Sequence, residues 1–75
     1  MIETDDATAM RQFRERHGLS PTAAAEALGI RQSSIWNHEH GQRGISAPLR
    51  ILMELINQRP ELLPLVRGLA NRLKR

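Results

Sequence analysis

One segment constrains the fold of this 75-residue chain more than any other: GLSPTAAAEALGIRQSSIWNHEHG, from Gly18 to Gly41. Ser20 is a good N-cap residue and Pro21 suits the first helical position, so a helix begins there and continues through the alanine-rich run that follows. Gly29 ends this helix, and a second short helix follows before the next glycine. The segment therefore predicts two short helices joined by one tight turn.

The second of these helices has an unusually polar outer side. On a helical wheel the inner side carries Ile35, His38 and Glu39, and the outer side carries Gln32, Ser33, Trp36, Asn37 and His40. Glutamine and asparagine each offer a donor and an acceptor to adenine, serine serves several base edges, and a flat apolar ring contacts a thymine methyl group or a sugar. Solvated helix faces have a similar composition, but the position directly after the turn favours insertion into a DNA major groove.

Three further helices and no strand are predicted. The first covers Thr8–Arg16, and the fourth is capped by Ser46 and has a buried apolar stripe, namely Leu49, Leu52, Met53 and Ile56. Arg59 and Pro60 end the fourth helix. The last helix is expected from about Pro60 to residue 74, bent near Pro64, or beginning only at Pro64.

The length and apolar content fit one small domain. A chain of 75 residues with 40% apolar residues must build its core from all of its helices together. The loop from Gly41 to Ile45 has two glycines that allow a left-handed or tight backbone, so it is expected to pack closely against a neighbouring element. We therefore predict an all-α fold, a compact five-helix bundle that forms one domain over residues 1–75, with its paired short helices at 20–40.

Charge is distributed unevenly along the chain. The net charge is +3, but residues 1–10 carry three acids and no base, whereas residues 67–75 carry four bases and no acid. A basic balance favours a phosphate-backbone partner, although basic ends are also common solubilising tails. The N-terminus is acidic where a signal peptide is basic, no apolar run approaches the ~18–20 residues of a membrane span, and cysteine is absent. A cytoplasmic protein without disulfides or membrane contact is expected.

The residue inventory argues against an enzyme or a metal protein. The chain has no nucleophile with a plausible base and orienting partner, no phosphate-cradling glycine loop and no paired acids in a chain large enough to shape a pocket. His38, Glu39 and His40 do not form a metal site, because residues two apart on a helix point to opposite sides. No catalysis, cofactor or metal is predicted, and no effector pocket is recognisable.

Residues Met10 to Leu63 resemble a Cro/repressor-type, or Xre-like, helix-turn-helix domain. The resemblance is carried without a gap in spacing by Arg14, Gly18-Leu19-Ser20, Ala25, Leu28-Gly29-Ile30, Ser33-Ser34-Ile35, Glu39-His40-Gly41 and Gln42-Arg43. The later segment, from Ser46-Ala47-Pro48 to Leu62-Leu63, resembles the form found in type II antitoxins of the HigA and MqsA kind. The resemblance implies a lambda-repressor-like fold, double-stranded DNA as the ligand and transcription regulation as the function.

The resemblance also implies roles for individual residues. Gln32, Ser33 and Asn37 match the positions at which the family reads bases, and Trp36 lies between them. The resemblance implies phosphate contacts for Ser34, Gln42 and Arg43, and the predicted set of phosphate contacts is completed by Ser20, Thr22, Arg31 and His40. Arg14 and Glu39 match a structural ion pair between the first and third helices. Two positions depart from the pattern: Pro21 replaces a glutamine that contacts a phosphate in many relatives, and His38 replaces a packed Leu or Trp, which predicts a buried neutral imidazole.

The last helix carries more apolar residues than one buried stripe needs. Its dimerisation residues are predicted to be Leu62, Leu65, Val66, Leu69 and Leu73, the alternative being that this helix simply caps the core. The predicted function is a homodimeric repressor of prokaryotic or phage origin, bound to an inverted-repeat operator in the nucleoid. The alternative is an antitoxin or adaptor that mainly binds a partner protein, such as a cognate toxin, and binds DNA secondarily.

Overall fold

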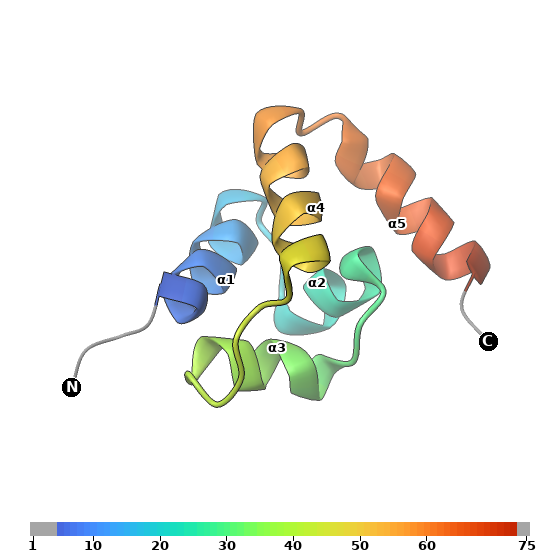
Figure 1. The fold of residues 1–75 in the computed structure, drawn as a ribbon. Coiled ribbons are helices and arrows are strands. Elements are labelled where there is room, and N and C mark those ends of the chain that lie inside the picture. Colours follow the sequence, from blue (N-terminus) through green and yellow to red (C-terminus); the bar gives the residue numbers. More distant parts are fainter. Residues whose placement is uncertain (1–4, 74–75) are drawn as a thin grey trace.

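The computed structural model describes residues 5–73 and consists of helices joined by short loops. The elements in chain order are α1 (Asp5–Arg16), α2 (Pro21–Leu28), α3 (Gln32–Glu39), α4 (Ala47–Gln58) and α5 (Leu62–Leu73). No strand occurs among the described residues, so the all-α, five-helix prediction is confirmed. In Figure 1, α4 stands between α1 and α5, while α2 and α3 lie together at its lower end.

The turn between α2 and α3 follows from local sequence chemistry. The Oγ atom of Ser20 accepts a hydrogen bond from the backbone N–H of Ala23 at 3.1 Å, which caps α2 as predicted. Gly29 adopts a left-handed conformation with φ of 70°, where a side chain would be strained. The N–H of Ile30 then donates to the carbonyl of Ala25 at 3.0 Å. This cap ends α2 before α3 begins at Gln32, which confirms the predicted pair of helices.

The core lies where the first four helices meet. It is formed by Met10 and Phe13 of α1, Ala24, Ala25 and Leu28 of α2, Ile35 of α3, and Met53 and Ile56 of α4. Small alanine side chains let α2 approach its neighbours closely, and Phe13 is the one aromatic ring in this cluster. From α5 only partly buried residues, Leu63 and Val66, pack against the core. The helix α5 is therefore an added layer, docked mainly on α2.

Two helix starts differ from the predictions. The helix α1 begins at Asp5 rather than Thr8, and α5 begins at Leu62 rather than at Pro60 or Pro64. The N–H of Leu62 donates to the carbonyl of Arg59 at 2.9 Å, which forms a turn before the helix proper. Pro64 is the third residue of α5, where its missing N–H would have no intrahelical partner. The chain therefore continues through Pro64 as one helix, and its expected end at residue 74 lies outside the described residues.

The loop after α3 is tied to α1, as its glycines predicted. The backbone N–H of Ile45 donates to Oδ2 of Asp6 at 2.8 Å, and Nη1 of Arg50 donates to Oδ1 of the same carboxylate at 3.0 Å. A Cβ atom at Gly44 would lie only 2.9 Å from Oδ2, so a larger residue there would have to displace the Asp6 carboxylate that accepts from Ile45. This contact fixes the start of α4 relative to α1.

None of the helices in the described part of the chain has the length and apolar character needed to cross a membrane.

Candidate nucleic-acid interface

The helix α3 divides into a buried side and an exposed side. Ile35 is fully buried and His38 is only 4% exposed, whereas the side chains exposed to solvent are Gln32, Ser33, Trp36 and His40. Asn37 and Ser34 are half-buried at the border. This division follows the helical wheel for the buried Ile35 and His38 and for the four exposed residues, whereas Asn37, predicted on the outer side, is half-buried. All of the side chains assigned to base reading reach solvent on a single helix.

The C-terminal end of α3 is held against α1 by a two-point ion pair. Nε of Arg14 lies 2.7 Å from Oε2 of Glu39, and Nη2 of Arg14 lies 3.0 Å from Oε1. The side chains are 21% and 11% exposed, so both charges are largely screened from water. The hydrogen bond to Glu39, opposed by a smaller effect of burial, raises the pKa of the Arg14 guanidinium above its ordinary value. The pair therefore fixes the orientation of α3 without contributing to its exposed side.

His38 and the following turn also position the exposed side of α3. The Nδ1 atom of His38 lies 3.1 Å from the carbonyl oxygen of Arg43. A carbonyl oxygen only accepts, so Nδ1 is the donor, and the buried imidazole closes the turn. The carbonyl of Asn37 accepts from the N–H of Gln42 at 2.8 Å, and Gly41 has a left-handed φ of 70°. The side chains of Gln42 and Arg43 are thereby exposed directly after α3.

The residues assigned to phosphate contacts surround α3 at the surface. Most of them are exposed, namely Ser20, Thr22, Arg31, His40, Gln42 and Arg43, and Ser34 is half-buried. Arg31 precedes α3 as its N-cap but makes no side-chain capping hydrogen bond. Within residues 5–73, neither Arg31 nor Arg43 takes part in an ion pair, whereas Arg14, Arg50 and Arg67 do. Two uncommitted cations therefore lie at the two ends of the exposed side of α3.

Trp36 and His40 form a stacked pair that was not predicted from the sequence. Their ring centroids are 3.9 Å apart and their planes differ by 15°. The Nδ1 atom of His40 also lies 2.8 Å from the carbonyl oxygen of Trp36. The four-residue spacing on one helix was the available signal, because such residues are neighbours on the helix surface. The pair places a rigid aromatic block among the polar side chains of α3.

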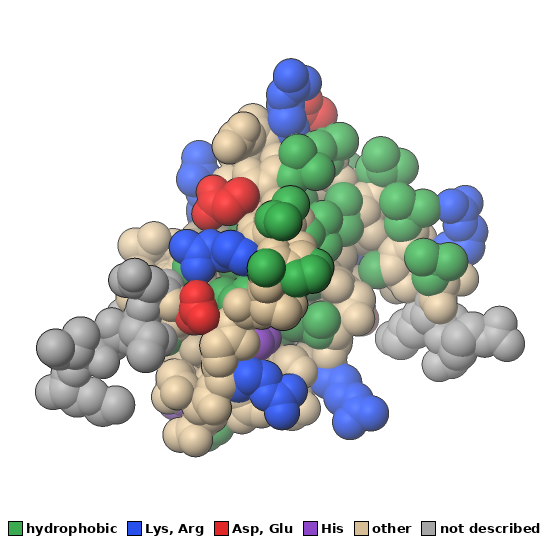
Figure 2. All heavy atoms as spheres, in the orientation of Figure 1, with side chains coloured by type: hydrophobic (Ala, Val, Ile, Leu, Met, Phe, Trp, Pro, Cys, Tyr) green, Lys and Arg blue, Asp and Glu red, His purple; other side chains and the backbone are tan. Residues whose placement is uncertain are grey.

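A second exposed region, on α4 and α5, is apolar. We call it the apolar face, and it consists of Ile51 (67% exposed), Leu55 (48%), Leu65 (59%), Leu69 (38%) and Leu73 (74%). Figure 2 shows hydrophobic side chains gathered over these two helices. The predicted dimerisation residues divide here: Leu65, Leu69 and Leu73 are exposed, whereas Leu62 and Val66 are half-buried, with Val66 packed against the core.

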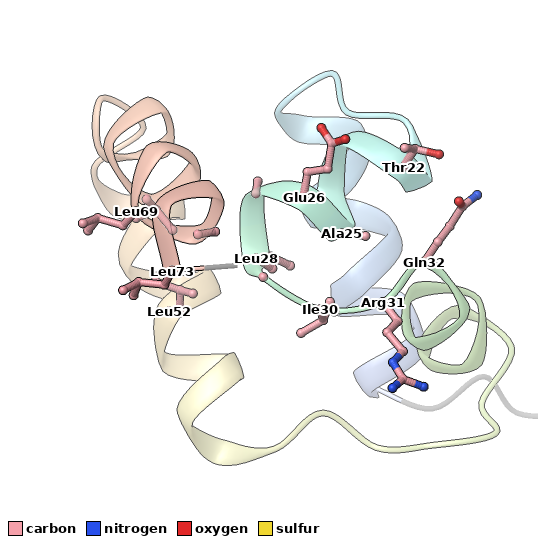
Figure 3. A pocket seen from close by; sticks show the side chains of 14 residues that line it. Thr22, Ala25, Glu26, Leu28, Ile30, Arg31, Gln32, Leu52, Leu69 and Leu73 are labelled. Atoms are coloured by element: carbon pink, nitrogen blue, oxygen red, sulfur yellow. The ribbon is translucent and has the colours of Figure 1, made fainter. Parts of the chain in front are cut away.

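An open groove of about 840 Å³ is lined by residues of α2, the turn that follows it, the start of α3, α4 and α5. In Figure 3, Leu52, Leu69 and Leu73 lie on one side and Leu28 lies opposite, while Arg31 marks the turn at the other end. No pattern in the sequence indicated this groove, because it is formed by the docking of two helices that are far apart in the chain. Its walls connect the apolar face to the residues that precede α3.

Proteins of similar sequence share the helix-turn-helix domain. The profile of a family described as a helix-turn-helix domain matches residues 7–70. A protein of Thermococcus kodakarensis, provisionally named an HTH-type transcriptional regulatory protein, is 36% identical over 47 residues, covering 63% of this chain and 15% of that protein. A protein of Pyrococcus furiosus with the same provisional description is 33% identical over 60 residues, covering 80% of this chain and 19% of that protein. No solved structure gives a significant match.

The chain spans less than a fifth of the length of these two relatives. The family profile, in contrast, covers most of the chain and runs from α1 into α5. It includes the capped α2, the left-handed turn at Gly29 and the exposed side of α3. The narrower resemblance to Xre-like repressors and antitoxins stays a prediction. The chain belongs to the helix-turn-helix domain family.

Proposed function

We propose that this chain is a sequence-specific, double-stranded DNA-binding regulator of transcription. The observation that carries the proposal is the exposed side of α3, which presents polar side chains directly after the glycine turn of a helix-turn-helix domain. In this motif the second helix enters the major groove. The two archaeal relatives, both provisionally named HTH-type transcriptional regulatory proteins, support the same class of function.

The proposed contacts divide into reading and positioning. Gln32, Ser33, Trp36 and Asn37 face the base edges, where amide side chains match the donor and acceptor pattern of adenine. Phosphates are contacted by Ser20, Thr22, Arg31, Ser34, His40, Gln42 and Arg43. The uncommitted guanidinium groups of Arg31 and Arg43 suit this role, because no carboxylate in the described part of the chain competes for them.

The finer proposal is an Xre-like homodimeric repressor that acts in the cytoplasm. The exposed leucines of α5, with Ile51 and Leu55 of α4, provide apolar surface that a second copy would cover. Two-fold symmetry then predicts an inverted-repeat operator whose half-sites lie about one helical turn apart. Repression would be steric, because bound protein excludes polymerase or an activator from the same DNA.

A selection experiment tests the proposal. The purified chain is mixed with random duplex DNA near physiological salt, and the bound pool is sequenced for the unmodified protein, for Asn37→Ala and for Asn71→Ala. Asn71 is exposed on α5 and serves as the matched control. We expect an enriched inverted repeat that loses information at fixed positions only with Asn37→Ala. A folded protein that enriches no sequence contradicts the proposal.

The apolar face supports a second candidate function, an antitoxin or adaptor that grips a partner protein. The five side chains of this face are between 38% and 74% exposed, so they provide apolar surface that the core of this chain does not bury. This candidate would be favoured if the purified protein enriched no DNA sequence in the selection while its circular dichroism spectrum showed that it was helical. An enriched sequence that depends on α3 would leave partner binding at most a second role.

A further inference from the structure

The amide and hydroxyl groups on the exposed side of α3 explain hydrogen bonding to bases, but they do not explain the stacked pair of Trp36 and His40. Trp36 is the only tryptophan in the chain, and its side chain is 55% exposed although it is the largest apolar group on α3. The imidazole of His40 covers one face of its indole ring at a centroid distance of 3.9 Å. A large ring held in solvent costs free energy unless a partner covers its remaining surface.

The backbone restrains this pair. The carbonyl oxygen of Trp36 accepts from the backbone N–H of His40 at 3.0 Å and lies 2.8 Å from Nδ1 of the same residue. A carbonyl oxygen only accepts, so Nδ1 carries the proton and the imidazole is held over the indole. Stacking on this held imidazole favours the observed orientation of the indole. A side chain that is already ordered loses less entropy on binding than a mobile one.

The chemistry of the major groove limits what an indole can contact there. Base edges present acceptors on guanine, a donor on cytosine, and both kinds on adenine. An apolar ring pressed against these groups would leave them without water or a hydrogen-bond partner, which is costly. The C5-methyl group of a pyrimidine is the one apolar group on the major-groove edges. Thymine carries this methyl group, and so does 5-methylcytosine.

We propose that the Trp36–His40 pair recognises the C5-methyl group of a pyrimidine in the major groove. The inference rests on the proposed DNA-binding function and adds the chemical group that this part of α3 reads. Trp36 makes the contact with the methyl group, and His40 is a positioning residue that holds the indole in place. The polar neighbours on α3 read hydrogen-bonding groups of other bases.

The DNA arm of the test uses a duplex taken from the selection experiment. Each thymine is replaced in turn by deoxyuridine, which removes only the methyl group, and binding is measured by fluorescence anisotropy. At one thymine per half-site, we expect the replacement to weaken binding roughly threefold to tenfold. Trp36→Ala should bind the two duplexes equally at that position. Asn37→Ala should bind more weakly but keep the deoxyuridine penalty, which makes it the matched control.

Two pools distinguish the sources of the methyl group. Selection from unmethylated DNA that gives a thymine-dependent sequence assigns thymine as the partner. If the sequence appears only in a pool containing 5-methylcytosine, then methylated cytosine is the partner. Either result supports the inference, provided that the methyl dependence disappears in Trp36→Ala.

The protein arm tests the role of His40 without DNA. Acrylamide quenching of the single tryptophan reports how much of the indole is accessible to solvent. We expect His40→Ala to raise the quenching constant and to reduce the discrimination between thymine and uracil. His40→Phe, which can stack but cannot bond the carbonyl, should restore most of both. Unchanged quenching in His40→Ala would overturn the positioning role.

The outcomes separate this inference from the function on which it rests. Sequence-specific binding that shows neither a deoxyuridine penalty at any thymine nor a preference for 5-methylcytosine over cytosine overturns the inference and leaves the proposed function intact. The same penalty in Trp36→Ala and in the unmodified protein also overturns it, because another residue then reads the methyl group. Absence of sequence-specific binding in both the unmethylated and the 5-methylcytosine pool overturns both.

Discussion

The outer sides of α3 and of the α4–α5 pair are both exposed, yet they are built from opposite chemistry. The outer side of α3 carries amide, hydroxyl and imidazole groups around one tryptophan, whereas the apolar face carries five aliphatic side chains. Each helix also has an inner side that packs on the core, so amphipathicity alone does not distinguish them. The difference lies in what the solvent-facing side offers a partner: hydrogen bonds in one region and apolar surface in the other.

The two regions are also fixed to the core in different ways. The helix α3 is held by buried Ile35 and by charged and polar contacts with α1 and the following loop. The helix α5 has no fully buried residue and rests on α2 through half-buried ones. A reading surface needs a defined orientation, which the anchoring of α3 provides. The layer formed by α5 leaves exposed the leucines that the proposed dimer would cover.

The largest expected effect comes from placing charges in the apolar face. The double variant Leu65→Glu with Leu73→Glu changes two exposed side chains, so folding should be retained. Sedimentation should show a monomer, and operator affinity should fall about a hundredfold or more because the two half-sites are no longer bound together. Gln12→Glu, exposed on α1, is the control. A monomeric unmodified protein would contradict the proposed dimer, and a double variant that is as dimeric as the unmodified protein would place the interface elsewhere.

Removal of one member of the Arg14–Glu39 pair should have the next largest effect. Glu39→Ala leaves the guanidinium of Arg14 largely covered and without its carboxylate, so the free energy of unfolding should fall by about 1–3 kcal/mol. Glu61→Ala, from an exposed pair at 3.8 Å, should cost less than about 1 kcal/mol. Urea denaturation of both variants measures the difference, and equal losses would show that the buried pair has no special role.

The same pair has a defined dependence on pH. Because the folded-state pKa of Arg14 is raised above its ordinary value by the hydrogen bond to Glu39, its contribution to stability is fully present at every pH below that ordinary value. The contribution is lost only as the pH rises through the folded-state value, above the range used for binding measurements. The stability difference between the unmodified protein and Glu39→Ala should therefore show no transition from the arginine near neutral pH.

A smaller and less selective effect is expected from Arg43→Ala. The Arg43 side chain is exposed after α3, where a phosphate contact carries no sequence information. Binding to selected and to random DNA should weaken by similar factors, and the slope of log affinity against log salt should decrease by about one. A loss confined to the selected sequence would instead assign Arg43 to base reading.

The smallest expected effect comes from Gly68→Ala, a change in α5 that tests whether the two regions are independent. Gly68 lies inside α5 and is exposed, and a Cβ atom added there would meet no neighbouring atom within 4 Å. Gly68→Ala should raise the free energy of unfolding by about 0.5–1 kcal/mol, because alanine loses less backbone entropy on forming a helix. The consensus sequence selected by α3 should stay the same. A changed consensus would show that α5 controls the orientation of α3.

Local signals predicted most of the fold. Ser20 and Ser46 each cap the start of a helix by accepting a hydrogen bond from a nearby backbone N–H, and Gly29 caps the end of α2 in a left-handed conformation. Because these caps depend on residues close in the chain, the positions of α2 and α4 followed from the sequence. The start of α5 was predicted incorrectly because Pro60 and Pro64 both offered a helix start. The turn that Leu62 makes onto Arg59 selected a position between them.

The candidate site also has parts that local sequence predicts and parts that it does not. The exposed side of α3 follows from a helical wheel, since one buried isoleucine sets which residues face outward. Which leucines of α5 are exposed and which are half-buried depends on how α5 docks against α2, and no local pattern encodes that docking. The groove beside Leu28 and Leu73 arises from that docking as well. The Trp36–His40 stack was within reach of sequence reasoning, because its four-residue spacing on a helix is a known contact distance.

If the proposed function is correct, α3 contacts DNA and the apolar face does not. Nuclear magnetic resonance titration of the labelled protein with the selected duplex distinguishes the two surfaces residue by residue. We expect the largest amide shifts on residues 31–43, with those of Leu65 and Leu73 unchanged once the dimer is formed. Shifts concentrated on α4 and α5, with α3 unaffected, would show that the helix-turn-helix does not contact DNA in this chain.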